Sequence, residues 1–89
     1  MKIKVRLLRP LSDAVDAPEM DVAVPEGASV RHLIEHLCEQ YPALAQNIYA
    51  STGAMVDSLA MFVNGKPSDA RTSLAEGDEV TLLFPAGGG

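Results

Sequence analysis

The chain has 89 residues and a formal net charge of −5, and 47% of its residues are hydrophobic, so we expect one domain with a single modest core. The negative charge argues against nonspecific nucleic-acid binding, which requires clustered lysine and arginine. No apolar run approaches the roughly 20 residues that span a bilayer, and the single cysteine excludes an intrachain disulfide, so we expect a cytoplasmic protein with no membrane partner.

The first three segments predict a hairpin. Residues 2–8 alternate apolar and polar side chains, which indicates a strand with Ile3, Val5 and Leu7 on one face. The segment from Pro10 to Pro18 contains serine, aspartate and two prolines, and predicts a loop. Residues 20–24 alternate again and predict a second strand, antiparallel to the first.

An amphipathic helix follows. Ser29 is a favourable N-cap residue, and Pro42 ends the helix by disfavouring helical geometry at the residue before it. The helical stripe comprises Val30, Leu33, Ile34, Leu37, Cys38 and Tyr41. Residues 43–49 predict a short second helix, with Leu44 and Ile48 turned inward.

The next segments predict a second hairpin after a loop at residues 50–57. Residues 59–64 form the expected third strand, and Asn64-Gly65 is a strong signal for a two-residue turn. A short strand within residues 66–73 belongs at a sheet edge, because Pro67 has no N–H to donate.

The last elements complete a two-layer α+β domain. Residues 74–78 predict a tight turn, and residues 79–84 predict the final strand with Val80, Leu82 and Phe84 inward. One amphipathic helix has one sheet to cover. The expected core is Ile3, Val5, Leu7, Val22, Val30, Leu33, Ile34, Leu37, Met61, Val63, Val80 and Leu82.

Two patterns in the predicted main helix suggest a metal site and a reactive thiol, but structural roles explain both. The sequence from His32 to His36 matches H-x-x-E-H, a zinc-protease pattern, yet these side chains lie opposite the apolar stripe and no third ligand is evident. We therefore expect a solvated helix surface and no metal site. Cys38 lies at the margin of the apolar stripe, and a structural thiol is favoured over a sulfur relay.

The carboxyl end is unusual because it consists of three glycines after Phe84-Pro85-Ala86. Glycine buries no side chain and loses the most backbone entropy on ordering. Such a tail is either an inert remnant or a thread narrow enough to enter a partner's active site.

Several motifs together resemble the ubiquitin-like β-grasp sulfur carriers, which include the small subunit of molybdopterin synthase and the thiamine-biosynthesis carrier. They are the ββαββ order, the Asn64-Gly65 turn, the run 74–80 before the final strand, and the terminal diglycine. The residues of the carboxyl-terminal segment that match are Gly77, Asp78, Glu79, Val80, Phe84, Pro85, Gly88 and Gly89. Tyr41-Pro42 and the segment 62–65 resemble the molybdopterin type more closely, whereas Gly87 stands where the family often has alanine or serine.

The resemblance implies a fold and a domain organisation. It implies a ubiquitin-like β-grasp, with a mixed sheet of four to five strands covered by one main helix and with the first and last strands parallel at its centre. It further implies a folded domain at residues 1–85 and a flexible tail at residues 86–89.

The resemblance also implies a carrier that is not itself an enzyme. An ATP-dependent activating enzyme would adenylate the carboxylate of Gly89, which then becomes a thiocarboxylate, while Gly87 and Gly88 give the tail access to partner sites. No cofactor is bound permanently, since ATP is used by the activating enzyme. The expected sulfur acceptor is the large subunit of molybdopterin synthase. The alternatives are a ubiquitin-like protein modifier, a carrier for cysteine synthesis, thiamine or transfer-RNA thiolation, and an interaction module with an inert tail.

The alternation of the strands also predicts an interface. It turns Leu8, Phe62 and Leu83 to the side of the sheet away from the helix, and grouped apolar residues on a small domain suggest a partner. We expect this patch, rimmed by Arg6 and Lys66 and adjoining Phe84 and Pro85, to dock the activating enzyme. An equally good alternative is that the tail or a loop covers part of it.

Overall fold

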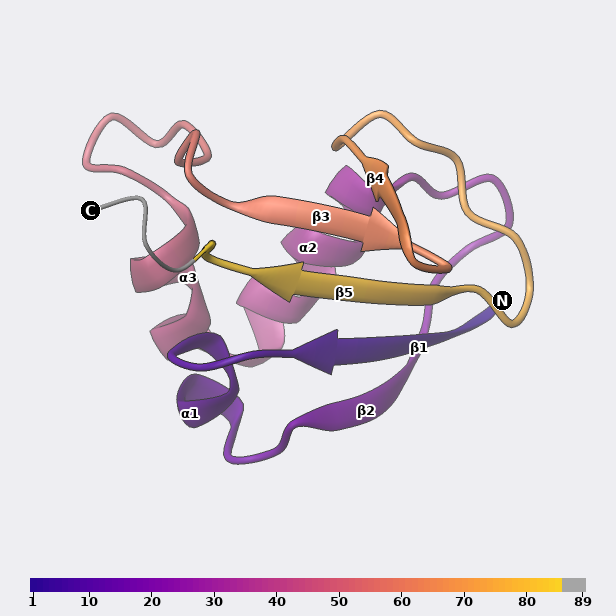
Figure 1. Cartoon of the computed structure of the whole chain (residues 1–89), viewed down its shortest axis with the longest axis horizontal. Helices are drawn as coiled ribbons and strands as arrows, with labels where there is room; N and C mark the ends of the chain where they lie inside the picture. The colour runs from indigo at the N-terminus through magenta and orange to yellow at the C-terminus, as the bar shows by residue number, and fades with distance from the viewer. Residues whose placement is uncertain (86–89) are drawn as a thin grey trace.

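A five-stranded mixed sheet forms the centre of the computed structural model, which describes residues 1–85 (Figure 1). The strand order is β2-β1-β5-β3-β4. The strands are β1 (Lys2–Leu7), β2 (Glu19–Ala23), β3 (Ala60–Val63), β4 (Lys66–Ser68) and β5 (Glu79–Leu83). The helices are α1 (Leu11–Val15), α2 (Val30–Gln40) and α3 (Pro42–Ile48). The predicted α+β architecture is confirmed.

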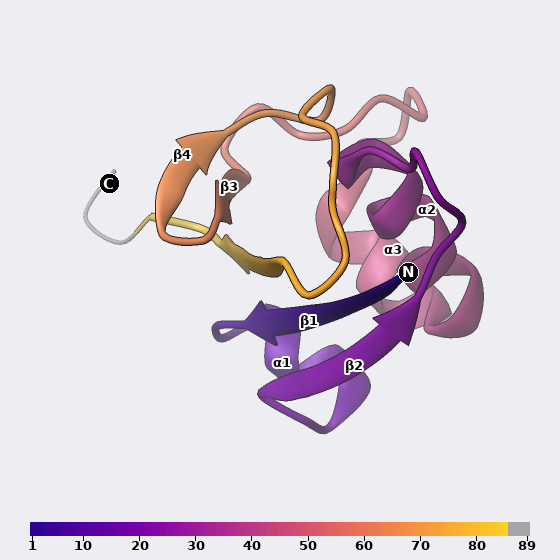
Figure 2. The same ribbon diagram turned by 90° about the vertical axis from the view of Figure 1, so that its right-hand side faces the viewer.

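The two central strands are parallel although they lie at opposite ends of the chain. Val5 of β1 is opposite Val80 of β5, while β1 pairs antiparallel with β2, and β5 pairs antiparallel with β3. The parallel pairing inferred from the family resemblance is therefore confirmed. The strand that leads into the tail, β5, is therefore an interior strand, paired with β1 on one side and with β3 on the other (Figure 2).

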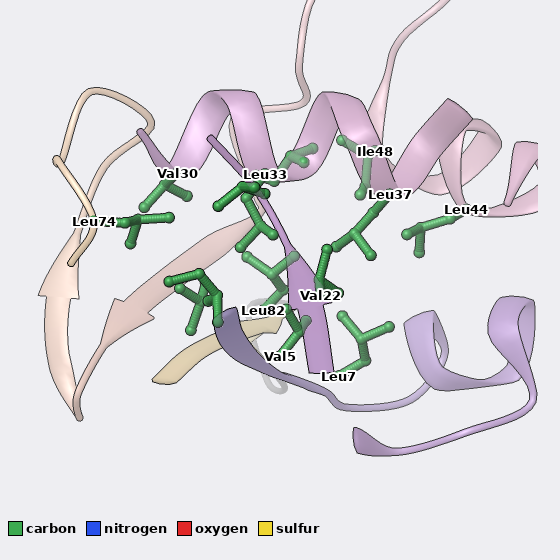
Figure 3. Packing of buried hydrophobic residues seen from close by; sticks show 14 of the residues in the cluster. Val5, Leu7, Val22, Val30, Leu33, Leu37, Leu44, Ile48, Leu74 and Leu82 are labelled. Atoms are coloured by element: carbon green, nitrogen blue, oxygen red, sulfur yellow. The ribbon is translucent and has the colours of Figure 1, made fainter. Parts of the chain in front are cut away.

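The core lies between α2 and one face of the sheet. In Figure 3, Val30, Leu33 and Leu37 of α2 lie above side chains of β1, β2 and β5. The predicted core residues are all buried except Met61 and Val63 of β3, which are half-buried and pack against the core. Further buried residues complete the cluster: Leu11, Val24, Ala28, Leu44, Ile48, Leu59 and Leu74.

The prediction of an uninterrupted loop from Pro10 to Pro18 is wrong, because residues 11–15 form the helix α1. Leu11 is fully buried, and Ala14 and Val15 pack against the core. Their spacing of three and four residues is that of one helical face, a signal obscured by the prolines around it. The burial of Leu11 stabilises a helix too short to persist alone.

The main helix begins at the predicted N-cap. The Ser29 hydroxyl accepts a hydrogen bond from the His32 backbone N–H at 3.4 Å, and His32 Nδ1 accepts one from the Ser29 N–H at 3.0 Å. These two bonds form a capping box with histidine in the place usual for glutamate or glutamine.

Within residues 1–85, no helix is long and apolar enough to cross a membrane.

Candidate functional site

The carboxyl-terminal strand β5 lies in the middle of the sheet. At its end, the backbone N–H of Leu8 donates to the carbonyl of Leu82 at 3.2 Å. Phe84 is half-buried against the core and Pro85 is exposed. The predicted tail, including Gly87, Gly88 and Gly89, lies outside the described residues.

A network of hydrogen bonds fixes the start of β5. The turn before it contains Gly77 at φ +83°, a left-handed conformation that favours glycine. The carboxylate of Asp78 accepts from the Ala75 N–H at 2.8 Å and from Asn64 Nδ2 at 3.0 Å. The Asn64 side-chain oxygen accepts in turn from the Glu79 N–H at 3.0 Å.

This network gives the Gly77-Asp78 motif a structural purpose. The Gly77 N–H donates to the Lys2 carbonyl at 2.9 Å, which ties the turn to β1, while Asn64 ties it to the β3–β4 hairpin. Asn64 itself has φ 53° and Gly65 has φ 81°, as the predicted two-residue turn requires. The motif therefore aligns the interior strands β1, β5 and β3 at the end opposite Pro85.

The face of the sheet away from α2, here called the open face, has an apolar group beside a polar row. Thr81 lies between Arg6 on β1 and Phe62 on β3, and the strand beyond places Pro67 beside Phe62. Phe62 is half-buried but does not pack against the core. The strand register thus confirms that Phe62 belongs to the open face.

The apolar group continues toward the tail. Leu83 is opposite Ala60, and its position on β5 is diagonal to that of Phe62. Leu8, which follows β1, is 42% exposed, an unusual fraction for a large apolar side chain in this domain. We call the apolar surface of Leu8, Ala60, Phe62, Pro67 and Leu83 the docking face.

The two predicted rim residues, Arg6 and Lys66, lie at different places relative to the docking face. Arg6 lies on the open face, where its guanidinium donates to the Glu19 carboxylate at 3.0 Å, and this bond raises the pKa of Arg6. Lys66, in contrast, is opposite Val63 and shares the face of that residue. The two-residue turn sets this register, so Pro67 lies directly opposite Phe62 and Lys66 is exposed at the adjacent position, where its role at the rim stays a prediction.

Two residues of the H-x-x-E-H pattern, His32 and Glu35, have structural partners. His32 takes part in the capping box, and Glu35 accepts from Arg31 Nε at 3.1 Å. No group of three or more potential metal ligands lies together among the residues that the structure describes. Cys38 is half-buried, and this burial raises the pKa of its thiol to about 11, so it is a poor thiolate nucleophile at neutral pH.

Sequence reasoning missed two members of the candidate site, Pro67 and Glu19. The Asn64-Gly65 turn was a sufficient signal for Pro67, because a two-residue turn places Pro67 opposite Phe62. Glu19 had no such signal, since its proximity to Arg6 depends on the register between β1 and β2.

The ThiS family model matches residues 5–89 of the chain. Small archaeal modifier protein 1 of Haloferax volcanii is 26% identical over 84 residues, which cover 94% of this chain and 97% of that protein. A crystal structure of the Haloferax protein superposes with a TM-score of 0.91 at 25% identity, with both chains covered completely.

Two more distant structures share the fold. The putative molybdopterin converting factor subunit 1 of Pyrococcus furiosus is 24% identical with a TM-score of 0.78, covering 97% of this chain and 99% of its own. A Helicobacter pylori complex of subunits 1 and 2 of molybdopterin-converting factor gives a TM-score of 0.64 at 20% identity, with both chains covered completely.

Proposed function

Because this chain belongs to the ThiS family of ubiquitin-like sulfur carriers, we propose that the carboxylate of Gly89 is its functional group and that it carries sulfur as a thiocarboxylate. The observation that supports this proposal is the family match over residues 5–89, which extends to a carboxyl end of three glycines. A carboxylate is a poor electrophile, so transfer of AMP from ATP, with release of pyrophosphate, would supply a leaving group. Sulfide would then attack the acyl carbon and displace AMP.

The described domain is suited to present the tail to other proteins and has no reactive thiol of its own at neutral pH. Its central strand leads directly into the tail, and its half-buried thiol has a raised pKa. We propose that the activating enzyme provides the ATP site and the catalytic groups, and that the carrier provides Gly89 and the surfaces that are recognised.

Intact-mass measurement tests this proposal. Incubation with ATP, sulfide and the activating enzyme should increase the mass by about 16 Da, because sulfur replaces oxygen in the acyl substitution. The matched control is the chain extended by one alanine after Gly89, which retains the fold but moves the carboxylate. An unchanged mass of the native chain, with an enzyme shown to be active on another carrier, would contradict the proposal.

The docking face is the proposed contact with the activating enzyme. Phe62 and Leu83 are the central residues, and Arg6, Phe84 and Pro85 adjoin them. An aspartate at position 62 would place a charge within an apolar contact, so Phe62→Asp should reduce the rate of adenylation at least about tenfold. Ala23→Asp is the matched control, because Ala23 is exposed in strand β2, three strands from β3. Equal rates for the two folded variants would contradict this assignment.

We propose molybdopterin synthesis as the pathway that receives the sulfur, with the large synthase subunit as acceptor. The segments Tyr41-Pro42 and 62–65 support this choice by their resemblance to the molybdopterin type. Thiocarboxylated chain mixed with the large subunit and the pterin precursor should form molybdopterin, whereas chain with an unmodified Gly89 should not. Formation of no product would redirect the proposal to cysteine, thiamine or transfer-RNA thiolation.

Protein modification is a second candidate function. The relative at 26% identity is called a modifier protein, and its crystal structure superposes over the whole chain. An activated Gly89 could equally acylate a lysine of another protein. High-mass conjugates in cell lysate that disappear when Gly89 is deleted would support this function.

A further inference from the structure

The two edges of the sheet differ in what they offer to another strand. At one edge, β4 has only three residues, and its central residue, Pro67, has no N–H. At the other edge, β2 has five residues without proline, and no strand of the described residues 1–85 pairs with its outer side (Figure 1). An unpaired strand edge is a template for another chain unless it is blocked.

The hydrogen-bond pattern shows which backbone groups of β2 face outward. The Val24 N–H donates to the Met1 carbonyl at 2.8 Å, and the Leu7 N–H donates to the Pro18 carbonyl at 2.8 Å. In an antiparallel pair, bonded and non-bonded residue pairs alternate, so Val22 and Met20 bond to β1. The N–H and C=O groups of Glu19, Asp21 and Ala23 therefore point away from β1, toward the free edge.

The charge at this edge selects the partner. The side chains of Glu19 and Asp21 are exposed on the open face, on the same side of the sheet as Lys4 and Arg6 of β1. Antiparallel pairing of two β2 strands about Asp21 would put the two Asp21 carboxylates opposite each other, and the net charge of −5 adds to the repulsion. A second copy of this chain is thus disfavoured, whereas a strand with lysine or arginine at alternate positions is complementary.

The opposite face of β2 indicates which residues should alternate with the basic residues of the added strand. Met20 is half-buried and packs against the core, and Val22 is buried. Side chains of an added strand that do not face the acidic residues would lie on the side of Met20. Apolar residues suit that position, because successive side chains of a strand point to opposite faces.

We propose that the free edge of β2 binds an extended segment of a partner protein by strand addition, and that this segment alternates basic and apolar residues. The outward backbone groups of Glu19, Asp21 and Ala23 provide the hydrogen bonds. The Asp21 carboxylate selects the charge, because the Glu19 carboxylate is already bonded to Arg6. This edge lies three strands from Phe62, so the interaction is independent of the docking face and of the tail chemistry.

The probe is the peptide Val-Lys-Val-Lys-Val-Lys-Val, acetylated and amidated at its ends and added to the full, isotope-labelled chain. At low salt, the amide signals of Glu19, Asp21 and Ala23 should shift, and their hydrogen exchange should slow by at least about tenfold, as expected for newly bonded N–H groups. The same peptide with glutamate in place of lysine should leave these signals unchanged.

Two variants and one control make the outcome decisive. Ala23→Pro removes an outward N–H without removing a bond to β1, and Asp21→Lys reverses the charge of an exposed side chain. Each should weaken peptide binding at least about tenfold, and Asp21→Lys serves if the proline variant does not fold. Phe62→Ala should leave the peptide affinity unchanged, and failure of the mass test for Gly89 would not affect this result.

Four results would overturn the proposal. They are absence of saturable shifts at β2, shifts centred on the docking face, equal binding of the glutamate peptide, and concentration-dependent shifts of the same amides without peptide. The last result would identify a second copy of the chain as the occupant.

Discussion

The two faces of the central strands have the same backbone but opposite environments. On the face toward α2, Val80 and Leu82 of β5 are fully buried, whereas Thr81 and Leu83 of the same strand are only partly covered on the open face. Neighbouring residues therefore contribute to different properties. The covered face stabilises the fold, and the open face is available for recognition.

The largest expected effect compares adjacent leucines across the two faces. Leu82→Ala removes a fully buried side chain and should lower the free energy of unfolding by about 2–5 kcal/mol. Leu83→Ala removes a partly covered side chain and should cost less than about 1 kcal/mol, because less buried surface is lost. Urea unfolding of both variants measures the difference. Equal losses of unfolding free energy would show that both faces contribute alike to stability.

The second effect asks whether polar links at the strand ends matter as much as apolar burial. Asp78→Ala removes the acceptor for both the Ala75 N–H and Asn64 Nδ2, so unfolding should become easier by about 1–2 kcal/mol. Asp57→Ala is the matched control, because Asp57 is exposed in a loop. A loss no larger than that of the control would mean that the turn is held by its backbone alone.

A third, smaller effect concerns the helix that covers the sheet. Ser29→Ala removes the hydroxyl that caps α2 and should cost about 1 kcal/mol in thermal or urea unfolding. Ser51→Ala, at an exposed position outside the helices and strands, should change stability little. If both variants unfold alike, water replaces the capping hydroxyl without loss.

The smallest effect concerns Cys38, a half-buried residue at the margin of the core, and the pH dependence of stability. Burial raises the pKa of Cys38 from 9.0 to about 11, so the folded chain keeps its thiol proton at pH values where the unfolded chain loses it. The stability associated with the neutral thiol is complete below about pH 9 and decreases as the pH rises toward about 11. Cys38→Ala should remove this part of the pH dependence.

Alkylation gives a second measurement of the same thiol. At pH 8, iodoacetamide should react with folded chain at least about tenfold more slowly than with unfolded chain, because the thiolate fraction is lower in the fold. Equal rates in the two states would contradict the raised pKa.

Local sequence patterns alone determined the main strands, the main helix and the side of most residues in β1, β3 and β5. A period of two residues assigns strand side chains to opposite faces, so alternation was enough to put Leu82 inside and Phe62 outside. Asn64-Gly65 determined its turn because both residues adopt positive φ readily. The glycine terminus and the turn at Gly77-Asp78 carried the family resemblance, which also supplied the parallel pairing of β1 with β5.

The tertiary structure alone decided which residues became neighbours across elements. Alternation assigns a face but no partner strand, so the ion pair of Arg6 with Glu19 and the free backbone edge of β2 emerged only from register and strand order. Likewise, α1 was missed because its short apolar pattern is stabilised by burial of Leu11 against distant segments. Local propensity is a property of neighbouring residues in the chain, whereas these features depend on contacts between segments that folding brings together.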